Sequence, residues 1–408
     1  MGVTNPNRMR SFITALGTSV PAYNFPQNDI AFFMAQALQL DERDRRKLQA
    51  LYRQTRIERR YSVLPDFGRT ADEYTFFPNT PDLEPFPTVG QRMDLYRREA
   101  LPLALKAVQD CLDKTPTDGI THLITVSCTG MYAPGLDIEL IEALGLPGTT
   151  HRTAINFMGC YGAFNGLKTA DAIVRSDPEA RVLVVCVELC TIHFQKKTEE
   201  DHLISNALFA DGAAAVLVES RPREQGSLGM RTFYCDLMAE GRAEMGWIIN
   251  DHGFEMTLTS EVPTVIRQGI GQLLSRLLER SGLTIGEVDY YALHPGGRKI
   301  LEVIEQQLGI GAEENRFAYQ VLRQYGNMSS ATVLFVLKEI WQQLFASPVE
   351  TSGTPQHILS CAFGPGLTLE SMILDVVSAT VPRNDIPGLC EAQVFLPAAD
   401  PGISFRVT

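Results

Sequence analysis

"AINFMGCYGAFNGLKTADAIV" (Ala154–Val174) places one cysteine, Cys160, where a short apolar run gives way to apolar residues at helical spacing. The run before Cys160 is typical of the end of a β-strand, and the pattern after it is typical of a helix. Cys160 is therefore predicted to lie on a sharp turn, on the first residues of that helix. A helix N-terminus stabilises negative charge, and a thiolate carries one. Two interpretations stay open here: a reactive thiolate, or a buried structural cysteine, which is the commoner case.

The same alternation of apolar strands and amphipathic helices continues on both sides of this segment. Runs rich in Val and Ile predict strands that are buried on both faces. In the first half these runs are 121–128, 180–190 and 211–219, with helical patterns at 98–114 and 136–146. After a polar break at Glu219–Met230, a second set has helical patterns at 264–283, 297–310 and 328–345 and strands within 288–297 and 356–377. We expect an α/β protein built from two related halves, 1–225 and 226–408.

Composition excludes several classes of protein. The 408 residues are 45% hydrophobic and 21% charged, which is typical of a globular chain with a large core. The net charge of -12 argues against a surface that binds nucleic acid. Eight cysteines are scattered with no C-x-x-C pair, which predicts a reduced, cytoplasmic protein. No apolar run is long enough to cross a membrane, and the N-terminal segment lacks the apolar region of a secretory signal.

Two other polar residues stand at the ends of apolar elements. His294, in "YALHPGGRKILE", follows a predicted strand, and Asn327, in "YGNMSSATVLFVL", precedes a predicted helix. Open α/β sheets place their chemistry at such strand ends. Taken singly, His294 could be a hydrogen-bonded structural residue and Asn327 a helix N-cap. Together with Cys160 they supply the nucleophile, the base and the amide that thioester chemistry requires.

These motifs resemble those of type III polyketide synthases, the chalcone-synthase-like branch of the thiolase superfamily, and of its bacterial members in particular. The resemblance runs from "ITALGTSVP" (Ile13–Pro21) to "FGPGLTLE" (Phe363–Glu370), and it includes "HPGG", "YGNMSSA" and "ALFADGAAA" in the family's order. It implies the five-layered αβαβα thiolase fold and a homodimer. It also implies an acyltransferase that uses acyl-CoA and malonyl-CoA in iterative decarboxylative condensation. Neither a metal nor an organic cofactor is expected, because the CoA thioesters are substrates.

The resemblance also implies roles for single residues. Cys160 would carry the acyl chain, and before loading it would form a thiolate–imidazolium pair with His294. Both His294 and Asn327 would stabilise the enolate formed from malonyl-CoA. Phe209 matches one gatekeeper phenylalanine, and Met256 stands where the family has the other. The remaining substrate-binding positions implied are Cys128, Ala133, Cys190, His193 and Ser329 in the cavity, Phe363 in the "FGPG" loop and Lys47 at the CoA phosphates. Two further cationic positions of the family fall on the neutral Ala50 and Gln54, so that Arg53 or Arg56 would have to replace them.

The starter is the least constrained part of this interpretation. The flexible Met256 and the small Ala133 favour a medium or long fatty acyl starter and an alkylpyrone or alkylresorcinol product. The two thiols Cys128 and Cys190 instead resemble synthases that are primed by malonyl-CoA alone and make aromatic polyols.

Three alternatives outside this function were weighed. A ketoacyl synthase III-like enzyme shares the Cys, His and Asn, but it does not carry "HPGG". A metal or redox site at Cys186, Cys190 and His193 is disfavoured because the spacing along an apparent strand suits no tetrahedral pattern. A catalytically inactive binding protein is disfavoured because Cys160, His294 and Asn327 are all present.

Overall fold

A computed structural model describes residues 10–113, 115–345 and 355–377. Its main element is a mixed sheet of nine strands in the order β11-β12-β13-β8-β1-β7-β6-β4-β5. The strands of this sheet are β1 (Phe12–Ser19), β4 (His122–Ser127), β5 (His151–Asn156), β6 (Val182–Leu189), β7 (Asp211–Glu219), β8 (Ser227–Leu237), β11 (Tyr290–Leu293), β12 (His357–Gly364) and β13 (Thr368–Val377). The helices are α1 (Gln27–Ala37), α2 (Glu42–Gln54), α3 (Val89–Leu112), α4 (Leu136–Leu144), α5 (Gly162–Ser176), α6 (Glu200–Leu208), α7 (Val262–Ser281), α8 (Arg298–Leu308), α9 (Arg316–Tyr325) and α10 (Thr332–Phe345).

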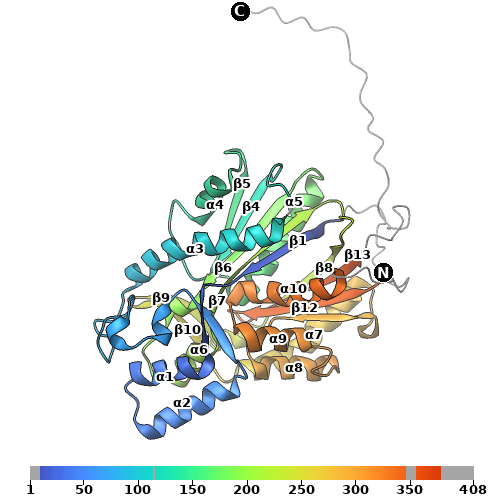
Figure 1. Ribbon diagram of the computed structural model, residues 1–408. Coiled ribbons are helices and arrows are strands. Elements are labelled where there is room, and N and C mark those ends of the chain that lie inside the picture. Colours follow the sequence, from blue (N-terminus) through green and yellow to red (C-terminus); the bar gives the residue numbers. More distant parts are fainter. Residues whose placement is uncertain (1–9, 114, 346–354, 378–408) are drawn as a thin grey trace, which may run out of the picture.

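The sheet consists of two parts joined by a short contact. Strands β1 and β4–β7 come from the first half of the chain, and β8 and β11–β13 come from the second. The two parts meet where β1 pairs with β8, through Phe12 with Gly229 and Ile13 with Leu228. In Figure 1 the first part rises toward β4 and β5, and the second lies below it beside α7, α8 and α9.

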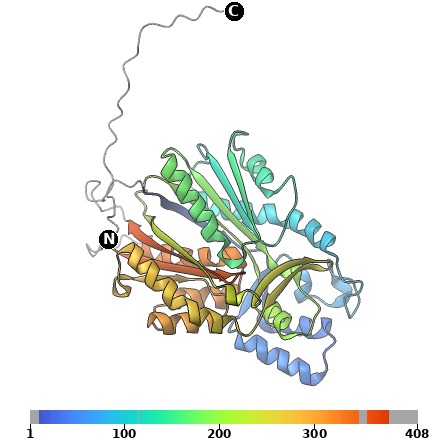
Figure 2. The ribbon, with the colours of Figure 1, turned by 180° about the vertical axis from the view of Figure 1, so that it is seen from behind.

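Both faces of the first part are covered by helices, as the apolar runs predict. Because side chains alternate along a strand, β6 divides its residues between two hydrophobic clusters. Val184 and its alternate neighbours pack with α5, while Leu183 and Val185 pack with α3. Helix α3 crosses the sheet in the view of Figure 1, and the green helix α5 crosses the opposite face in Figure 2.

Helices α5 and α10, one from each half, both reach across to the other half of the sheet. Lys168 of α5 forms an ion pair with Glu370 of β13, and Lys338 of α10 donates a hydrogen bond to the carbonyl of Leu16 in β1. Helices α7 and α8 cover the outer side of the second half, as α3 and α4 do for the first. The layers therefore run helix, sheet, helix, sheet, helix, which is the expected thiolase-like α/β fold.

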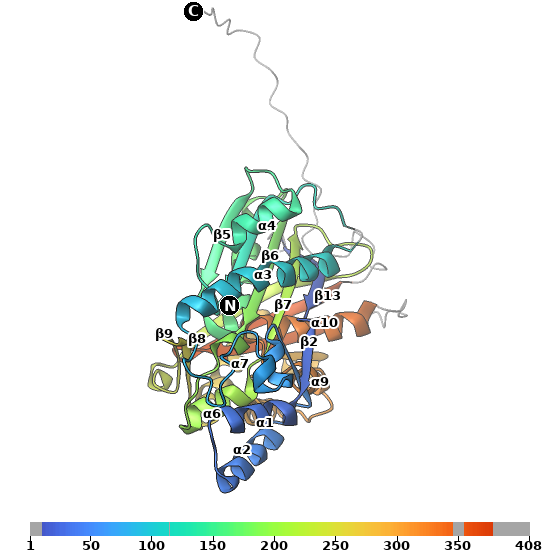
Figure 3. The same ribbon diagram turned by 60° about the vertical axis from the view of Figure 1, so that its left-hand side comes forward.

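A smaller lobe stands beside the sheet and closes over the ends of β6 and β7. It contains α1, α2 and α6, the hairpin of β2 (Tyr23–Pro26) and β3 (Arg59–Ser62), and the hairpin of β9 (Met245–Asn250) and β10 (Gly253–Leu258). Figure 3 shows α1, α2 and α6 gathered at this end of the molecule. A cluster of aromatic rings, with Phe33 packed against Phe67 and Phe194, forms its core. Among the described residues, no helix combines the length and the apolar character needed to cross a membrane.

Candidate active site

Cys160 lies on a one-turn 3₁₀ helix, Gly159–Tyr161, between β5 and α5, at the strand-to-helix turn predicted from the sequence. The glycines on either side of it are required by space and by backbone conformation. Gly159 has a φ of +76°, and a Cβ there would lie 2.4 Å from Cδ of Pro365. A Cβ on Gly162 would lie 2.8 Å from Cγ1 of Val126 in β4. Only glycine therefore allows the turn to pack this closely under the cysteine.

The predicted cavity residue Cys128 has a different place from the one expected. Its Sγ accepts a hydrogen bond of 3.0 Å from the backbone N–H of Gly159, so it lies beneath the Cys160 turn. It lines neither of the two cavities described below. The small thiol fits this position because Cys128 comes directly after β4, next to the strand that leads into the turn. Cys128 thus supports the nucleophile position and does not contact a substrate cavity.

His294 and Asn327 approach Cys160 from the second half of the chain. The amide of Asn327 lies 3.9 Å from Sγ of Cys160 through both Oδ1 and Nδ2. Its Oδ1 accepts hydrogen bonds from the N–H of Ser329 and the hydroxyl of Thr332. Its Nδ2 donates one hydrogen bond to the carbonyl of Gly296 at 3.3 Å, so one N–H of the amide is left for the Cys160 side. His294 is fully buried, and within the described residues neither ring nitrogen has a hydrogen-bond partner. Buried polar atoms without partners are rare, and here they mark a place where a substrate can bind.

One small cavity brings these three residues together. Its volume is about 20 Å³, and besides Cys160, His294 and Asn327 it is lined by Phe209, Met256, Phe363, Met245, Leu258, Gly296 and Ile300. We call it the nucleophile cavity. The structure thus places the three predicted catalytic residues, both predicted gate residues and Phe363 around the same space.

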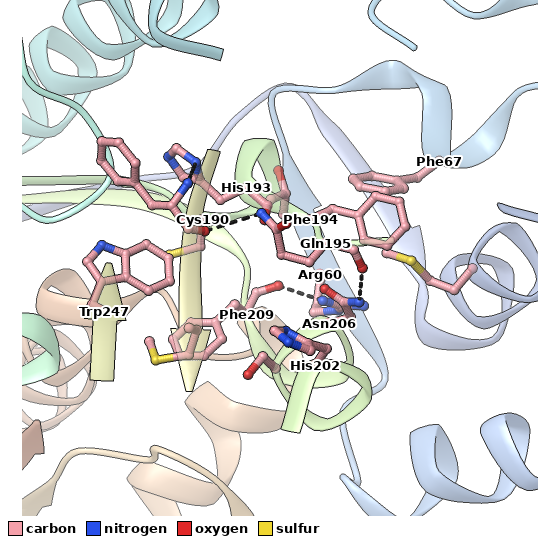
Figure 4. Close-up of a pocket in the computed structure, with 15 residues that line it drawn as sticks. Arg60, Phe67, Cys190, His193, Phe194, Gln195, His202, Asn206, Phe209 and Trp247 are labelled. Carbon is pink, nitrogen blue, oxygen red and sulfur yellow. Dashed lines mark hydrogen bonds between the residues drawn. The ribbon is translucent and has the colours of Figure 1, made fainter. Parts of the chain in front are cut away.

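A second cavity of about 40 Å³ lies on the other side of the gate, and Phe209 and Met256 line both spaces. We call it the inner cavity. Cys190 and His193, which were both predicted to line a cavity, are in its wall. The ring of His193 stacks on Phe254 at 4.3 Å, and its nitrogens are occupied by the carbonyl of Thr129 and the N–H of Phe254. His193 is therefore a fixed part of this wall (Figure 4).

Besides Cys128, three predicted binding residues lie outside both cavities. Ala133 is exposed in the loop between β4 and α4, so it does not line a cavity of its own chain. Lys47 is exposed on α2 and pairs with Asp44, one turn away, at 2.7 Å. Ser329 is buried beside Asn327, where its side chain hydrogen-bonds with the Cys160 thiol. The correspondence with the family located these positions along the chain, but it did not determine which way they face.

The charge state of the site differs from the expected ion pair. Burial raises the pKa of the Cys160 thiol to about 12, against an opposing hydrogen bond from Ser329. Burial lowers the pKa of His294 to about 3. The sequence argument counted the helix N-terminus and an imidazolium as stabilising a thiolate, but it omitted the cost of removing both groups from water. Both shifts favour the uncharged forms, a neutral thiol and a neutral imidazole, over the expected ion pair.

Glu188, at the end of β6, was missed by the sequence analysis. Its carboxyl accepts hydrogen bonds from the N–H of Cys128, the hydroxyl of Thr129 and the hydroxyl of Ser330. Burial raises its pKa to about 7, although these hydrogen bonds oppose the rise. The signal was present in the sequence, because a single acidic residue in the apolar run 180–190 can be buried only with partners.

The geometry also bears on the alternative metal or redox site. The ring nitrogens of His193 are both occupied by backbone groups, and Cys186 packs against α5 in the core. In the part of the chain that the structure describes, no group of three or more His, Cys, Asp or Glu side chains is placed to hold a metal ion.

Comparisons with known proteins agree with this arrangement. The family model described as "Chalcone and stilbene synthases, N-terminal domain" matches residues 3–222, and the corresponding C-terminal domain matches residues 232–378. The chain is 31% identical over 371 residues to "Alpha-pyrone synthesis polyketide synthase-like Pks18" of Mycobacterium tuberculosis, covering 90% of this chain and 91% of the relative.

Two solved structures are similar along their whole length. PKS-I from the brown alga Ectocarpus siliculosus has a TM-score of 0.83 and 30% identity, covering 90% of this chain and 98% of that one. The type III polyketide synthase domain of Steely1, a type I/III hybrid from Dictyostelium, has a TM-score of 0.81 and 27% identity, covering 90% and 99%.

Proposed function

Because the chain belongs to the chalcone and stilbene synthase family and is a type III polyketide synthase, we propose that it extends an acyl-CoA starter with malonyl-CoA units through a thioester on Cys160. The observation that carries this proposal is the meeting of Cys160, His294 and Asn327 on one cavity. They come from three loops far apart in the sequence, and each contributes a different chemical group. The reaction is an acyl transfer followed by decarboxylative condensation.

The first step loads the starter. Cys160 gives its proton to His294 and attacks the thioester carbonyl, the bond from that carbonyl to the CoA sulfur breaks, and His294 returns the proton to the departing thiolate. A buried thiol with a raised pKa is a weak nucleophile, so the reaction needs a base beside it. The lowered pKa of His294 keeps its imidazole neutral, and therefore able to accept a proton, at neutral pH.

The second step forms the new carbon–carbon bond. Malonyl-CoA loses CO2, and the electrons of the broken bond form an enolate on the thioester oxygen. Hydrogen bonds from His294 and from Nδ2 of Asn327 stabilise that oxygen, and removing one such donor typically costs about 3–4 kcal/mol in the transition state. The enolate carbon attacks the acyl group on Cys160, the bond from that carbonyl to the sulfur breaks, and the sulfur leaves as a thiolate that takes a proton from water. The extended chain, now on CoA, can return to Cys160 for another round.

The gate must open for this cycle to proceed. As they stand, the two cavities have volumes of about 20 and 40 Å³, which is room for a few water molecules. Rotation of the Phe209 and Met256 side chains would join the two spaces. Met256 favours this because an unbranched thioether side chain has several rotamers of similar energy.

Two starter classes follow from different observations. The sequence predicts a medium or long fatty acyl starter and an alkylpyrone or alkylresorcinol product, and the similarity to a relative described as an alpha-pyrone synthase supports the pyrone. The second candidate is a short polar starter, such as malonyl-CoA itself. It is supported by the inner cavity, where the fixed ring of His193 limits the length and where Arg60, His202 and Asn206 add polar groups.

A homodimer and a CoA site on α2 also belong to the proposal. Strand β5 is at the edge of the sheet and largely exposed, and Met131 nearby is 46% exposed. A second copy that covers β5 and the loop of Met131 would remove this apolar surface from water. The basic face of α2, with Lys47 and Arg53, would supply cations for the CoA phosphates.

The test is a measurement of condensation with malonyl-CoA in the absence of any carrier protein. We expect CO2 release and a polyketide product detected by mass spectrometry. The starter is decided by kcat/KM for acyl-CoAs from two to sixteen carbons, beside malonyl-CoA alone. A value that rises with chain length supports the fatty acyl starter, whereas a flat or falling series with product from malonyl-CoA alone supports the polar one. Activity that depended on a carrier protein would contradict the proposed function.

A further inference from the structure

The wall of the inner cavity contains a buried cation, Arg60, that forms no salt bridge among the described residues. Arg60, on β3, is only 3% exposed, and it lines the cavity together with Phe209 and Met256. Within the described residues its guanidinium forms no ion pair with a carboxylate. A buried cation without a salt bridge is costly, because it has lost its water. The charge of the nearby Asp211 and the ring of Tyr52, whose centroid is 5.7 Å from the guanidinium carbon, offset part of this cost.

The contacts of Arg60 leave one side of its guanidinium unoccupied. Nε donates to Oε1 of Gln27 at 2.8 Å, and Nη1 donates to the carbonyl of Phe209 at 2.5 Å. Nη2 is buried and has no hydrogen-bond partner. The neighbouring Asp211 does not fill this place, because its carboxyl takes hydrogen bonds from Val63 and Thr191.

The groups beside Arg60 form the polar end of the cavity. His202 and Asn206 of α6 lie next to it in Figure 4, while Trp247 and His193 lie at the opposite side. Nε2 of His202 faces Glu255 at 3.2 Å, and its Nδ1 is a second buried nitrogen without a partner. Two residues that each have a buried, unsatisfied nitrogen, Arg60 and His202, thus line the same space, whose other lining includes several apolar and aromatic side chains.

We propose that Arg60 binds a carboxylate at the far end of the starter acyl group, so that the enzyme is primed by a carboxylate-terminated acyl-CoA. An acyl chain on Cys160 that passes between Phe209 and Met256 enters the inner cavity, where Nη2 of Arg60 is the unpartnered cation. A carboxylate satisfies both the charge and the open hydrogen-bond position of this guanidinium. An alkyl end would leave both unsatisfied.

This inference rests on the proposed function, because it concerns the starter that Cys160 accepts. It also gives a physical basis for the polar starter class. Malonyl-CoA, succinyl-CoA and glutaryl-CoA all have the required group, and the depth of the cavity selects among them. The discriminating comparison is therefore between acyl groups of the same shape that differ only in the terminal charge.

The experiment pairs succinyl-CoA with 4-methylpentanoyl-CoA, and glutaryl-CoA with 5-methylhexanoyl-CoA, in which an isopropyl group replaces the carboxylate. In the wild type we expect kcat/KM for starter use to favour the carboxylate of at least one pair. Arg60→Met should reduce this preference at least tenfold, and Arg60→Lys should keep part of it. Arg59→Met, an exposed neighbour on the same strand, is the matched control and should leave the preference unchanged.

A purely structural role for Arg60, through its bond to the Phe209 carbonyl, would lower kcat/KM for both members of a pair and leave their ratio unchanged. That outcome would overturn the proposal. The proposal would also be overturned if Arg60→Met weakened the binding of free CoA as much as it weakened the binding of the carboxylate-terminated thioester, because the arginine would then be holding a CoA phosphate.

Binding measurements separate this inference from the proposed function. Calorimetry with Cys160→Ala protein requires no turnover, so it reports on the cavity even if no condensation is seen. We expect tighter binding of the carboxylate-terminated thioester of the preferred pair. If Arg60→Met does not fold, as judged by its thermal melt, the calorimetric comparison of the two thioesters in each pair decides alone. The proposal is overturned if neither carboxylate-terminated thioester binds more tightly than its isopropyl counterpart.

Discussion

Cys160 and His294 are both held away from water, and this determines how the nucleophile is generated. Burial raises the pKa of the cysteine and lowers that of the histidine, which favours the uncharged form of each group before a substrate binds. The thiolate must form in the same step in which the acyl group arrives. A site of this kind keeps its cysteine protected from small electrophiles until a substrate occupies the cavity.

The pH dependence of Cys160 alkylation tests this charge state. Below a pKa of about 12 the thiolate fraction grows about tenfold per pH unit, so the rate of reaction with iodoacetamide should rise steadily from pH 6 to pH 9. The rate is measured by mass spectrometry on the peptide that contains Cys160. Cys235, which is exposed while the other cysteines among the described residues are buried, is replaced by Ser to limit background reaction. A rate that is constant over this range would show a preformed thiolate–imidazolium pair.

Replacing the nucleophile separates the two chemical steps. In Cys160→Ala no acyl-enzyme can form, so condensation should fall below detection. Decarboxylation of malonyl-CoA should continue, because His294 and Asn327 still face the cavity. CO2 release and product formation are followed in the same reaction. Polyketide formed by this variant would mean that another thiol, such as Cys190, carries the chain.

At the scale of elements, the turn between β5 and α5 sets the position of the nucleophile. It is fixed from below by Cys128 and from above by Pro365 of the loop between β12 and β13. The turn therefore joins an element of each half of the chain. A small change in its backbone should move Cys160 relative to Asn327.

Gly159→Ala is the sharpest test of this turn. The new Cβ would lie 2.4 Å from Pro365, and alanine at a φ of +76° is strained, so we expect a loss of about 2–4 kcal/mol in the free energy of unfolding. Condensation should fall more than stability alone explains, since the thiol is displaced. Gly148→Ala is the control, because nothing lies within 4 Å of its Cβ. Urea unfolding and kcat/KM measured side by side check both expectations.

Most strands of the sheet could be predicted from the sequence, but β1 and β8, which join its two parts, were not predicted, and neither were the elements of the small lobe. β6 and β7 are continuous apolar runs, and this pattern has few alternatives in a protein of this size. The hairpins β2–β3 and β9–β10 are short and only partly buried, so their residues carry little periodicity. For the same reason the sequence did not identify Arg60 as a cavity residue, although it lines the inner cavity.

At the scale of the whole molecule, the site lies on the contact between the two halves. Cys160 and Glu188 belong to the first half, and His294, Asn327 and Ser330 belong to the second. The sequence located the three catalytic residues because each ends an apolar element. It could not show the hydrogen bonds that join the halves, such as that of Ser330 to Glu188, since these depend on packing between distant segments.

This contact should make stability depend on pH. Folding raises the pKa of Glu188 from 4.5 to about 7, so the folded chain keeps a proton that the unfolded chain has lost. The stabilising contribution is complete below about pH 4.5, is lost as the pH rises to about 7, and amounts to about 3 kcal/mol. We expect Glu188→Gln to remove this part of the decline between pH 5 and pH 8, as measured by urea unfolding. The free energy of unfolding of Glu188→Gln should also be lower overall. The NH2 group of the glutamine cannot accept hydrogen bonds from the three donors that surround the carboxyl of Glu188.

The exposed Glu224→Gln serves as the comparison for this measurement. It should show the same decline with pH as the wild type. If Glu188→Gln showed the same decline in stability with pH as the wild type, the Glu188 carboxyl would already be ionised in the folded protein at pH 5.

The division of the site between the two halves has a consequence for the chain during synthesis. The ribosome releases β4, the Cys160 turn and β6 before His294, Asn327 and Ser330 have been translated. While only the first half has been synthesised, Cys160 therefore lacks the imidazole of His294 as a proton acceptor. The carboxyl of Glu188 then lacks the hydroxyl of Ser330 as a hydrogen-bond donor. Because His294 and Asn327 both belong to the second half, we expect a chain that ends before them to keep Cys160 but to load no acyl group.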